Sequence, residues 1–483
     1  MQTETQAPTI CLCMIVKNEA DNLPRVIGSV KNVVDRMVVV DTGSDDNTVE
    51  VARALGAEVY LHPWEGPFDF AAARNLSLGY ARDEDWILIM DGDDELELTD
   101  VPLLRRLAAR LDVECWCFQT ISTNGNGVEA GAHWLPRLYR NGRGYHYEGR
   151  VHNQLVTNGS PQTCSGVRVY HYGYGLKPAE MKKKWKRSAH LVAQVLKREP
   201  ENWFQHYNFA VLLSNLGDGA KALKHLQIAI NGHNPASEPS RAVTLMSLYL
   251  KAQINRRQAE ALAKKKQWAA AARKFATAEA ACLVAIDIDD RFPDCLLLLG
   301  ELINRRGDEP QAAIKTCRKY LDTIADLRTK PRPHNLIINT MNLDYAGYYH
   351  LGKAYFKSAQ GRGMEAGGMA ARLDYQMAAL NFQQAVYKAP ANINFESLFE
   401  LYGCLAFCQM QCNDFEAGIQ TYRSMLRVMP QPKAEIYNNI GTAYGRLGQP
   451  RQARENYQAA LAIDPNYQAA KFNLEKMGVD IAA

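Results

Sequence analysis

The stretch Asp85-Trp86-Ile87-Leu88-Ile89-Met90-Asp91-Gly92-Asp93-Asp94-Glu95 joins an apolar run to four carboxylates grouped around one glycine. The run at 86–90 has the length and composition of a β-strand that is buried on both faces. We expect Gly92 to allow a sharp turn, so that Asp91 and Asp93 point the same way at the carboxyl end of the strand. Ligands of open α/β sheets bind at that end, and crowded carboxylates there suit a hard cation such as Mg²⁺ or Mn²⁺. The alternative is an acidic loop that caps the next helix.

Strand-like and helix-like segments alternate in the chain before this stretch. Apolar runs predict strands at 10–16, 37–41 and 58–61, and amphipathic patterns predict helices near 23–30, 48–55 and 68–81. This alternation predicts a mostly parallel, Rossmann-like sheet with right-handed crossovers. Asp41 and Asp91 both fall at strand carboxyl ends, so they are expected to line one crevice. That coincidence favours a ligand site over a helix cap.

The chain lacks the glycine motifs of the commoner nucleotide-binding folds. The first strand leads into Lys17-Asn18-Glu19 instead of G-x-G-x-x-G, which argues against a dinucleotide cofactor. Residues 347–353 spell G-x-x-x-x-G-K, but Ala354 replaces the Ser or Thr of a P-loop and no strand precedes the motif. We interpret this match as part of a helix.

Composition and charge exclude several classes of protein. The chain has 483 residues, enough for two or three domains, and a formal net charge of +4, which does not call for a nucleic acid or an acidic membrane surface. No secretory signal is visible at Met1–Pro8, and the apolar run at 10–16 is too short to cross a bilayer. We therefore expect a cytoplasmic protein without a membrane span.

The cysteine spacing predicts reduced, buried thiols. Eleven cysteines are present but none forms a C-x-x-C pair, which argues against zinc ligation. Two pairs alternate at the period of a strand and one trio recurs at the period of a helix: Cys11/Cys13, Cys115/Cys117 and Cys404/Cys408/Cys412.

Short motifs follow one another in a fixed order along the first part of the chain. They are Cys13-Met14-Ile15-Val16-Lys17-Asn18-Glu19, Val39-Val40-Asp41-Thr42-Gly43-Ser44, Ala73-Arg74-Asn75, Asp91-Gly92-Asp93, Pro136-Arg137-Leu138-Tyr139-Arg140, Tyr147-Glu148-Gly149-Arg150-Val151-His152 and His171-Tyr172-Gly173-Tyr174. Together they resemble the family 2 glycosyltransferases with a GT-A fold, and the last three resemble the bacterial subgroup that carries a tetratricopeptide tail. The resemblance covers residues 9–190 and implies a nucleotide-sugar donor, a divalent metal and inversion at the anomeric carbon.

The resemblance implies a role for each matched residue. Donor binding is implied for Val16, Asn18, Glu19, Asp41, Arg74, Asp91 and Gly92. Glu19 and Asp41 would accept hydrogen bonds from the base and ribose, and Arg74 would meet the base or the diphosphate. Metal binding, of Mn²⁺ or Mg²⁺, is implied for Asp93, Asp91 and His171. For His171, packing among the neighbouring tyrosines is the alternative to a metal-ligand role.

An inverting transfer needs one general base, and three residues are candidates: Glu148, Asp94 and His152. Members of the subgroup often have an acid directly after the histidine of this motif, whereas this chain has Asn153, which cannot accept a proton. That departure shifts the choice to Glu148. An ion pair with Arg150 or Arg137 is the alternative role for Glu148.

The pattern changes to long helices from Lys177. The run at 182–187 predicts a basic helix. We interpret its charged side as a solvated face rather than as a phosphate-binding patch. A period of roughly 34 residues follows and matches the tetratricopeptide repeat. Its clearest copy is Tyr437-x-x-Ile440-Gly441-x-x-Tyr444 with Ala453, Tyr457 and Pro465; the copy before it ends at Pro430, and another is interrupted by an insertion around 361–368. The expected domains are a flexible tail at 1–8, the GT-A domain at 9–176, a linker helix at 177–199 and a solenoid with a capping helix at 200–479.

The predicted fold class is therefore α/β plus all-α, a GT-A domain followed by a tetratricopeptide α-solenoid. The expected function is metal-dependent, inverting sugar transfer from a nucleotide sugar, with a UDP-sugar as the first choice, to a protein or peptide selected by the repeats. The alternatives are a polysaccharide- or glycolipid-building transferase docked by its repeats, a non-catalytic repeat scaffold, and a DNA-modifying enzyme. Nucleic acid is not an expected partner, and a homo-oligomer stays open. Because the matched acids and histidines precede Lys177, the donor crevice is expected to be complete without the repeats.

Overall fold

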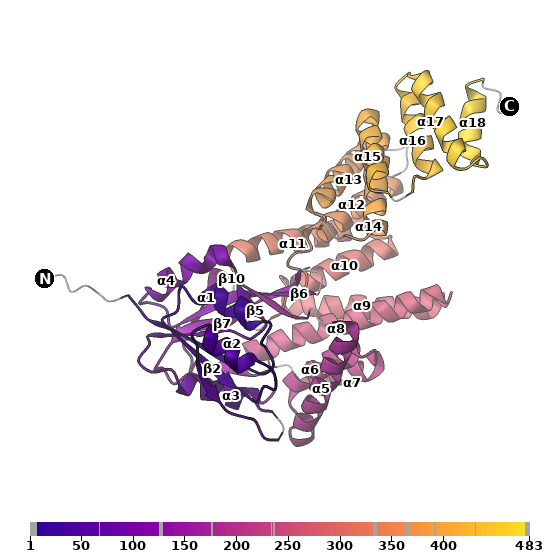
Figure 1. Cartoon of the computed structure of the whole chain (residues 1–483). Coiled ribbons are helices and arrows are strands. Elements are labelled where there is room, and N and C mark those ends of the chain that lie inside the picture. Colours follow the sequence, from indigo (N-terminus) through magenta and orange to yellow (C-terminus); the bar gives the residue numbers. More distant parts are fainter. Residues whose placement is uncertain are drawn as a thin grey trace. The chain divides into compact units, whose positions relative to one another are not determined.

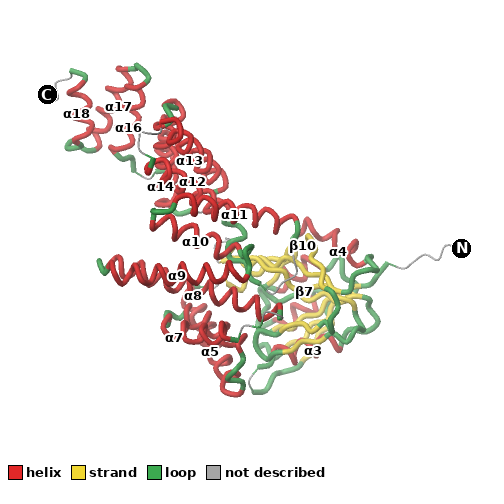
Figure 2. Tube along the Cα trace, turned by 180° about the vertical axis from the view of Figure 1, so that it is seen from behind, coloured by secondary structure: helices red, strands yellow, loops and turns green. Residues whose placement is uncertain are grey.

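The computed structural model describes residues 7–66, 68–124, 129–174, 177–232, 234, 237–331, 336–362, 368–390, 393–429 and 431–478. The chain forms two compact units (Figures 1 and 2). One contains Met1–Asp294 and Ala325–Asn342, and the other contains Cys295–Ile324 and Leu343–Ala483. The predicted domains divide instead at 176 and 199, and that division stays a prediction. Most of the predicted tail at 1–8 lies outside the described residues, as do Pro430 and the centre of the predicted insertion, 363–367.

The first unit contains a mixed sheet, in which eight strands are described. They are β1 (Ile10–Val16), β2 (Arg36–Asp41), β3 (Glu58–Leu61), β4 (Trp86–Ile89), β5 (Asp94–Leu96), β6 (Cys115–Asn124), β7 (Glu129–Arg140) and β10 (Gln162–Tyr174). Their order is β3-β2-β1-β4-β7-β6-β10-β5. A separate hairpin pairs β8 (His146–Glu148) with β9 (Gln154–Val156).

The first half of the sheet is the parallel part that the sequence predicts. Strands β3, β2, β1 and β4 are mutually parallel, and Val16 lies opposite Asp41 in the register. The carboxyl ends of β1, β2 and β4 therefore meet at one edge. The second half is joined through β7, which runs antiparallel to both β4 and β6.

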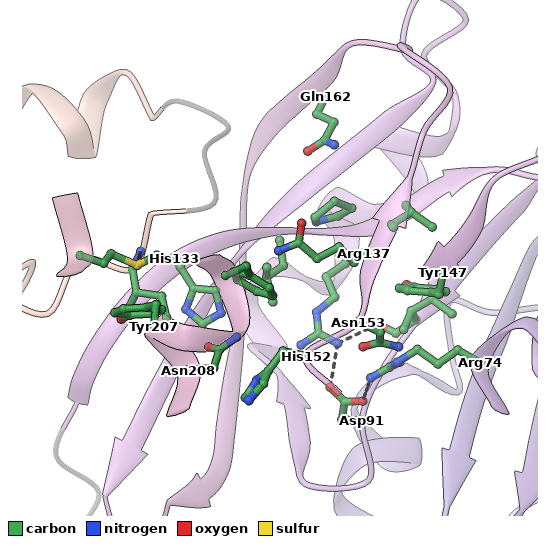
Figure 3. A pocket seen from close by; sticks show the side chains of 18 residues that line it. Arg74, Asp91, His133, Arg137, Tyr147, His152, Asn153, Gln162, Tyr207 and Asn208 are labelled. Carbon is green, nitrogen blue, oxygen red and sulfur yellow. Dashed lines mark hydrogen bonds and ion pairs between the residues drawn. The ribbon is translucent and has the colours of Figure 1, made fainter. Parts of the chain in front are cut away.

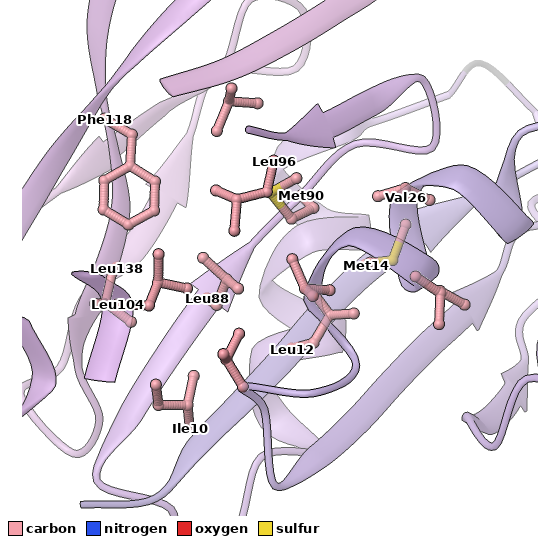
Figure 4. Close-up of a cluster of buried hydrophobic side chains, with 14 of the residues drawn as sticks. Ile10, Leu12, Met14, Val26, Leu88, Met90, Leu96, Leu104, Phe118 and Leu138 are labelled. Atoms are coloured by element: carbon pink, nitrogen blue, oxygen red, sulfur yellow. The ribbon is translucent and has the colours of Figure 1, made fainter. Parts of the chain in front are cut away.

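Both faces of β1 and β4 are buried. Alternate residues such as Leu12 and Leu88 belong to one core, which contains side chains of α1 (Leu23–Val30), α2 (Thr48–Ala54) and α4 (Val101–Ala108) (Figure 4). The intervening residues, including Cys13 and Ile89, belong to a second core with Ala71 of α3 (Phe70–Gly79). Burial on both faces explains why these strands are continuous apolar runs in the sequence. Each of the eleven cysteines is a free thiol and is buried or half-buried.

Helices fill the rest of the chain. In the first unit they are α5 (Pro178–Arg198), α6 (Trp203–Asn215), α7 (Gly219–Asn231), α8 (Glu238–Lys264) and α9 (Trp268–Ile288). Two helices, α10 (Pro293–Arg306) and α11 (Pro310–Thr329), cross the division between the units. The second unit continues with α12 (Asp344–Gly361), α13 (Gly368–Lys388), α14 (Phe395–Gln411), α15 (Phe415–Val428), α16 (Ala434–Arg446), α17 (Pro450–Ile463) and α18 (Gln468–Lys476).

The glycines of the predicted repeats lie where two helices touch. A Cβ at Gly352 would lie 2.8 Å from the Phe382 ring, and a Cβ at Gly441 would lie 2.7 Å from the Tyr457 ring. The repeat pattern of glycine followed by an aromatic thus records close helix pairing, as expected for a solenoid of helix pairs. The P-loop-like stretch 347–353 is part of α12, as the sequence predicts. Among the described helices, none is both long and apolar enough to cross a membrane.

A buried carboxylate anchors residues 336–341 to the first unit. Asp294 is fully buried and accepts hydrogen bonds from the backbone N and Nδ2 of Asn339 (2.9 and 2.7 Å) and from the backbone N and Oγ1 of Thr340 (2.9 and 2.7 Å). Ile338 in turn exchanges two backbone hydrogen bonds with Ala132 of β7, both 3.1 Å long. Asp294 therefore holds this segment against the sheet.

We predict that Asp294→Ala loosens this segment. Four donors lose their buried acceptor, so the first unit should be destabilised by about 2 kcal/mol or more. Hydrogen exchange at Ile338 should accelerate, while exchange in α16 and α17 stays unchanged. The matched control is Asp287→Ala, which removes an exposed carboxylate from α9. Equal exchange at Ile338 in both variants would contradict the anchoring role.

Candidate active site

The acidic stretch after β4 is held by two arginines from distant elements. Asp91 forms ion pairs with Arg74 of α3 and with Nη1 of Arg137 of β7, the latter at 3.4 Å (Figure 3). The same Nη1 lies 3.0 Å from Asp94, whose side chain is completely buried. Asp94 also accepts a 2.8 Å hydrogen bond from the backbone N of Asp91. Burial would raise the pKa of Asp91, but Arg74 and Arg137 hold it below its usual range, so this carboxylate is ionised at neutral pH.

Asp93, Asp94 and His171 form a cluster that could hold a metal ion. One potential ligand atom from each residue lies within 4.8 Å of the other two. His171 Nδ1 is 3.2 Å from Asp93 and 3.0 Å from Asp94. Burial would lower the pKa of His171, but these hydrogen bonds raise it to about 10. The sequence grouped Asp91 with Asp93 and His171, whereas in the structure Asp94 joins that cluster and Asp91 pairs with the arginines.

Gly173 leaves room at this cluster. A Cβ at this position would lie 2.7 Å from His171 Nε2 and would also collide with Asp93 Oδ2. The two ligand atoms therefore converge on a space that only glycine keeps open. A neutral imidazole nitrogen and a carboxylate oxygen are suitable ligands for Mn²⁺, so these residues fit a divalent cation that displaces the proton of His171 as it binds.

Gly92 is required for a different reason from the one predicted. Its φ angle lies outside the left-handed region, so the backbone makes no glycine-only turn there. A Cβ at Gly92 would instead lie 2.7 Å from Cγ of Glu19, and the chain continues directly into β5, an edge strand antiparallel to β10. The expected turn is present, because the backbone N of Asp94 donates a 3.1 Å hydrogen bond to the carbonyl of Asp91, but it does not need a φ angle that only glycine adopts. The absent side chain of Gly92 admits Glu19 beside the acidic stretch.

The loops after β1 and β2 are tied to each other. Asp41 is buried and accepts hydrogen bonds from the backbone N of Gly43 and Ser44 (3.0 and 3.1 Å) and from the Ser44 hydroxyl. Asn18 has a positive φ of 57° and binds the second loop through Ser44 Oγ and the backbone N of Asp45, both at 2.9 Å. Val16 accepts from the backbone N of Thr42 at 3.0 Å. These predicted donor-binding residues thus shape one rim, and Asp41 already accepts three hydrogen bonds there.

A pocket of about 340 Å³ opens beside the arginine-bound Asp91 (Figure 3). Its inner part includes Arg74, Asp91, Arg137 and Tyr147. The rest is lined by His133, Leu135, His152, Asn153, Gln154, Phe204, Tyr207, Asn208, Met246 and Ile337, among others.

One wall of this pocket comes from α6, beyond the predicted glycosyltransferase domain, and the expectation that the donor crevice is complete without the repeats stays a prediction. Phe204, Tyr207 and Asn208 lie after Pro200, so the pocket beside Asp91 is not complete without the helical part of the chain. Packing fixes this wall, because Val151 clusters with Val192 of α5 and Leu212 of α6. The buried Gln205 also donates a 2.9 Å hydrogen bond to the carbonyl of Val151.

The three base candidates differ in their access to the pocket. Glu148 does not line it; its side chain is 69% exposed and pairs with His146 at 3.2 Å. Asp94 is buried between Arg137 and His171 and does not line it either. His152 lines the pocket with an accessible side chain, and the surrounding protein lowers its pKa to about 4. Its backbone adopts a left-handed φ of 57°.

Asn75 has a role that the sequence did not reveal. Its side chain donates to the carbonyl of Tyr147 at 2.9 Å and accepts from the backbone N of Tyr147 at 2.7 Å. Strand β8 is thereby fastened to α3, and the Tyr147 ring lies 5.4 Å from the Arg74 guanidinium. The sequence signal for this role was the position of Asn75 directly after Arg74. Arg74 pairs with Asp91 in the site, and Asn75 holds the strand that lies beside it.

Comparison with known families agrees with this geometry. Residues 11–173 match the family described as glycosyl transferase family 2. The first part of this chain therefore resembles a family 2 glycosyltransferase domain. Residues 434–467 match the tetratricopeptide repeat. The match to the glycosyltransferase family ends at Gly173, and α5 and α6 follow it in the sequence.

The relatives are similar over part of their length. A protein of Synechococcus elongatus named TPR repeat-containing protein is 32% identical over 52% of this chain and 62% of its own. The SPbeta prophage-derived glycosyltransferase SunS of Bacillus subtilis is 25% identical over 51% of this chain and 58% of its own. The chain spans less than two thirds of these curated relatives. A solved glucosyl-3-phosphoglycerate synthase from Mycobacterium tuberculosis, in complex with Mn²⁺, UDP and glucosyl-3-phosphoglycerate, is 25% identical over 24% of this chain and 44% of its own, with a TM-score of 0.19.

We predict that Gly173→Ala closes the space between Asp93 and His171. The new methyl group occupies the space between Asp93 Oδ2 and His171 Nε2, so Mn²⁺ affinity measured by calorimetry should fall by about tenfold or more. Gly166→Ala, in the same strand, is the control because its Cβ would make only an ordinary 3.8 Å contact with Leu103. If both variants bind Mn²⁺ like the wild type, the ion binds elsewhere.

Proposed function

We propose that the chain is a metal-dependent, inverting glycosyltransferase that uses a nucleotide sugar, with a UDP-sugar as the expected donor, and an acceptor that enters the pocket beside Asp91. The observation that carries this proposal is the charge-balanced group of Asp91, Asp93, Asp94, Arg74, Arg137 and His171 at the carboxyl edge of the sheet. It lies inside the region that matches family 2.

The donor would bind across the ends of β1, β2 and β4. Asp93 and His171 would hold the divalent cation, which supplies Lewis-acid stabilisation of the departing nucleoside diphosphate. The loops at Asn18 and Asp41 form the rim where the nucleoside would rest, and Glu19 lies beside the acidic stretch. Arg74 and Arg137 keep Asp91 ionised, so its carboxylate can accept hydrogen bonds from the sugar or ribose.

The acceptor would occupy the part of the pocket that α6 lines. Phe204 and Tyr207 offer aromatic surface, and Asn153 and Asn208 offer amides. Among the described residues, no hydrogen-bond partner meets the buried Nδ2 of Asn153 or Asn208. Buried donors of this kind normally find an acceptor, and the carbonyl oxygens of a peptide would provide one. Apart from Arg74, Asp91 and Arg137, the lining carries no arginine, lysine or carboxylate, which favours an uncharged acceptor group such as a peptide segment.

We further propose His152 as the general base. The acceptor atom forms a bond to the anomeric carbon while the bond from that carbon to the phosphate oxygen breaks, and the electron pair leaves with the diphosphate. The proton of the acceptor passes to His152, the candidate base that lines the pocket and is neutral at physiological pH. Glu148 and Asp94 are less suitable, because Glu148 does not line the pocket and Asp94 is held by Arg137 and His171.

The pH dependence tests this assignment. A base whose pKa is lowered to about 4 stays unprotonated down to that pH, so kcat/KM for transfer should not fall between pH 7 and pH 5. His152→Ala should reduce transfer by about 10²-fold or more with donor binding retained, and Glu148→Gln should stay near wild type. Near wild-type transfer by His152→Ala, or a strong effect of Glu148→Gln, would transfer the role elsewhere.

The donor itself can be identified by a panel of nucleotide sugars in the presence of Mn²⁺. The correct donor should raise the thermal transition of the full chain, since a ligand that binds only the folded state stabilises it. Asp93→Ala should abolish Mn²⁺-stimulated turnover of that donor, whereas Asp83→Ala, at an exposed carboxylate, should not. Full metal-stimulated turnover by Asp93→Ala would overturn the proposed metal-assisted transfer.

A further inference from the structure

The basic run of α5 contains one side chain that differs from its neighbours. Lys182, Lys183, Lys186 and Arg187 are exposed, as expected for a solvated face, whereas Lys184 is half-buried. Its Nζ donates a 3.0 Å hydrogen bond to the carbonyl of Gly173. Lys184 thus turns toward the site, while the other four basic side chains of the run face solvent.

The carbonyl that Lys184 binds belongs to the residue that keeps the metal cluster open. The space above Gly173 is bounded by Asp93 Oδ2 and His171 Nε2. The ammonium group of Lys184 interacts electrostatically with the carboxylates of Asp93 and Glu19. Burial raises the pKa of Glu19. Burial would also raise the pKa of Asp93, but the hydrogen bond to His171 and the nearby positive charges lower it, and the charge of Lys184 contributes a lowering at both carboxylates. A positive charge is therefore held beside the cluster by a helix outside the region that matches family 2.

We propose that Lys184 binds the diphosphate of the nucleotide-sugar donor and stabilises the negative charge that this group gains as it leaves. The inference rests on the proposed transferase function. The ligand class is a diphosphate bound together with a divalent cation at Asp93 and His171. An ammonium group is a common phosphate ligand because it combines a full charge with several N–H donors.

Lys184 transfers no proton in this role. When the bond between the anomeric carbon and the phosphate oxygen breaks, the electron pair stays on that oxygen, and Lys184 remains an ammonium that donates a hydrogen bond to it. The interaction is stronger with the departing diphosphate than with the intact donor, since the charge on the oxygen increases. Lys184 should therefore affect kcat as well as binding.

A purely structural role is the main alternative, because Lys184 also fastens α5 to β10 through Gly173. Lys184→Gln separates the two roles. Glutamine can still donate an N–H to the Gly173 carbonyl but carries no charge. Lys183→Gln is the matched control, since it makes the same substitution at an exposed position of the same helix.

The test is calorimetric binding to the full chain of Mn²⁺ alone and of inorganic pyrophosphate in saturating Mn²⁺. Pyrophosphate requires no knowledge of the base or sugar. Lys184→Gln should weaken pyrophosphate by about tenfold or more and leave the Mn²⁺ affinity equal to or higher than that of the wild type, because a nearby cation is removed. Lys184→Arg should restore part of the affinity, and Lys183→Gln should behave like the wild type.

The outcomes distinguish the two levels of the proposal. Normal pyrophosphate binding by Lys184→Gln, with Mn²⁺ bound by the wild type, overturns the role of Lys184 and leaves the proposed function standing. Failure of the wild type to bind either Mn²⁺ or pyrophosphate overturns both. A loss of Mn²⁺ affinity equal to the loss of pyrophosphate affinity in Lys184→Gln would mean that the lysine only supports the cluster. If Lys184→Gln does not fold, Lys184→Met takes its place, because it removes the charge but keeps the length and the apolar part of the side chain; unchanged pyrophosphate affinity in that variant would overturn the role of Lys184.

Discussion

Three carboxylates in four consecutive residues must coexist at the end of a buried strand, and the site depends on how their charge is balanced. Asp91 and Asp94 share Arg137, Arg74 also meets Asp91, and His171 meets Asp93 and Asp94. The three cations come from α3, β7 and β10, so the balance exists only when the sheet has its full order. Removing one partner of such a group leaves a buried charge without compensation, which destabilises the fold and the site together.

Local patterns were sufficient for the elements and insufficient for the pairings between them. Buried strands and amphipathic helices repeat at their own periods, so β1, β2, β4 and the paired helices of the second unit could be predicted. The position of Arg137 beside Asp91 depends on β7 running antiparallel to β4, with Leu88 opposite Leu138. No short-range pattern records that register. The edge strand β5 was missed for a related reason, since an acidic segment of three residues becomes a strand only through its pairing with β10.

The candidate site residues divide in the same way. Asp93 and His171 were grouped by motif and do lie together, whereas the choice of Glu148 as base depended on an exposure that the sequence does not encode. The fully buried Asp94 and the accessible His152 are distinguished only by what packs around them. The wall formed by α6 was equally hidden, because Tyr207 reads as an ordinary residue of an amphipathic helix until Gln205 and Val151 fix its position.

The first unit is discontinuous in the sequence, and this affects how such proteins can be recombined. Its pocket uses Ile337, from a segment that Asp294 holds in place after the chain has passed through Cys295–Ile324 of the other unit. A crossover at residue 176 or 199, the domain boundaries predicted from the sequence, would therefore join a half-built pocket to foreign helices. Exchange of the repeats between relatives should be tolerated only downstream of Asn342. Specificity and chemistry are then inherited as one block, and only the more distal helices are free to diverge as an exchangeable module.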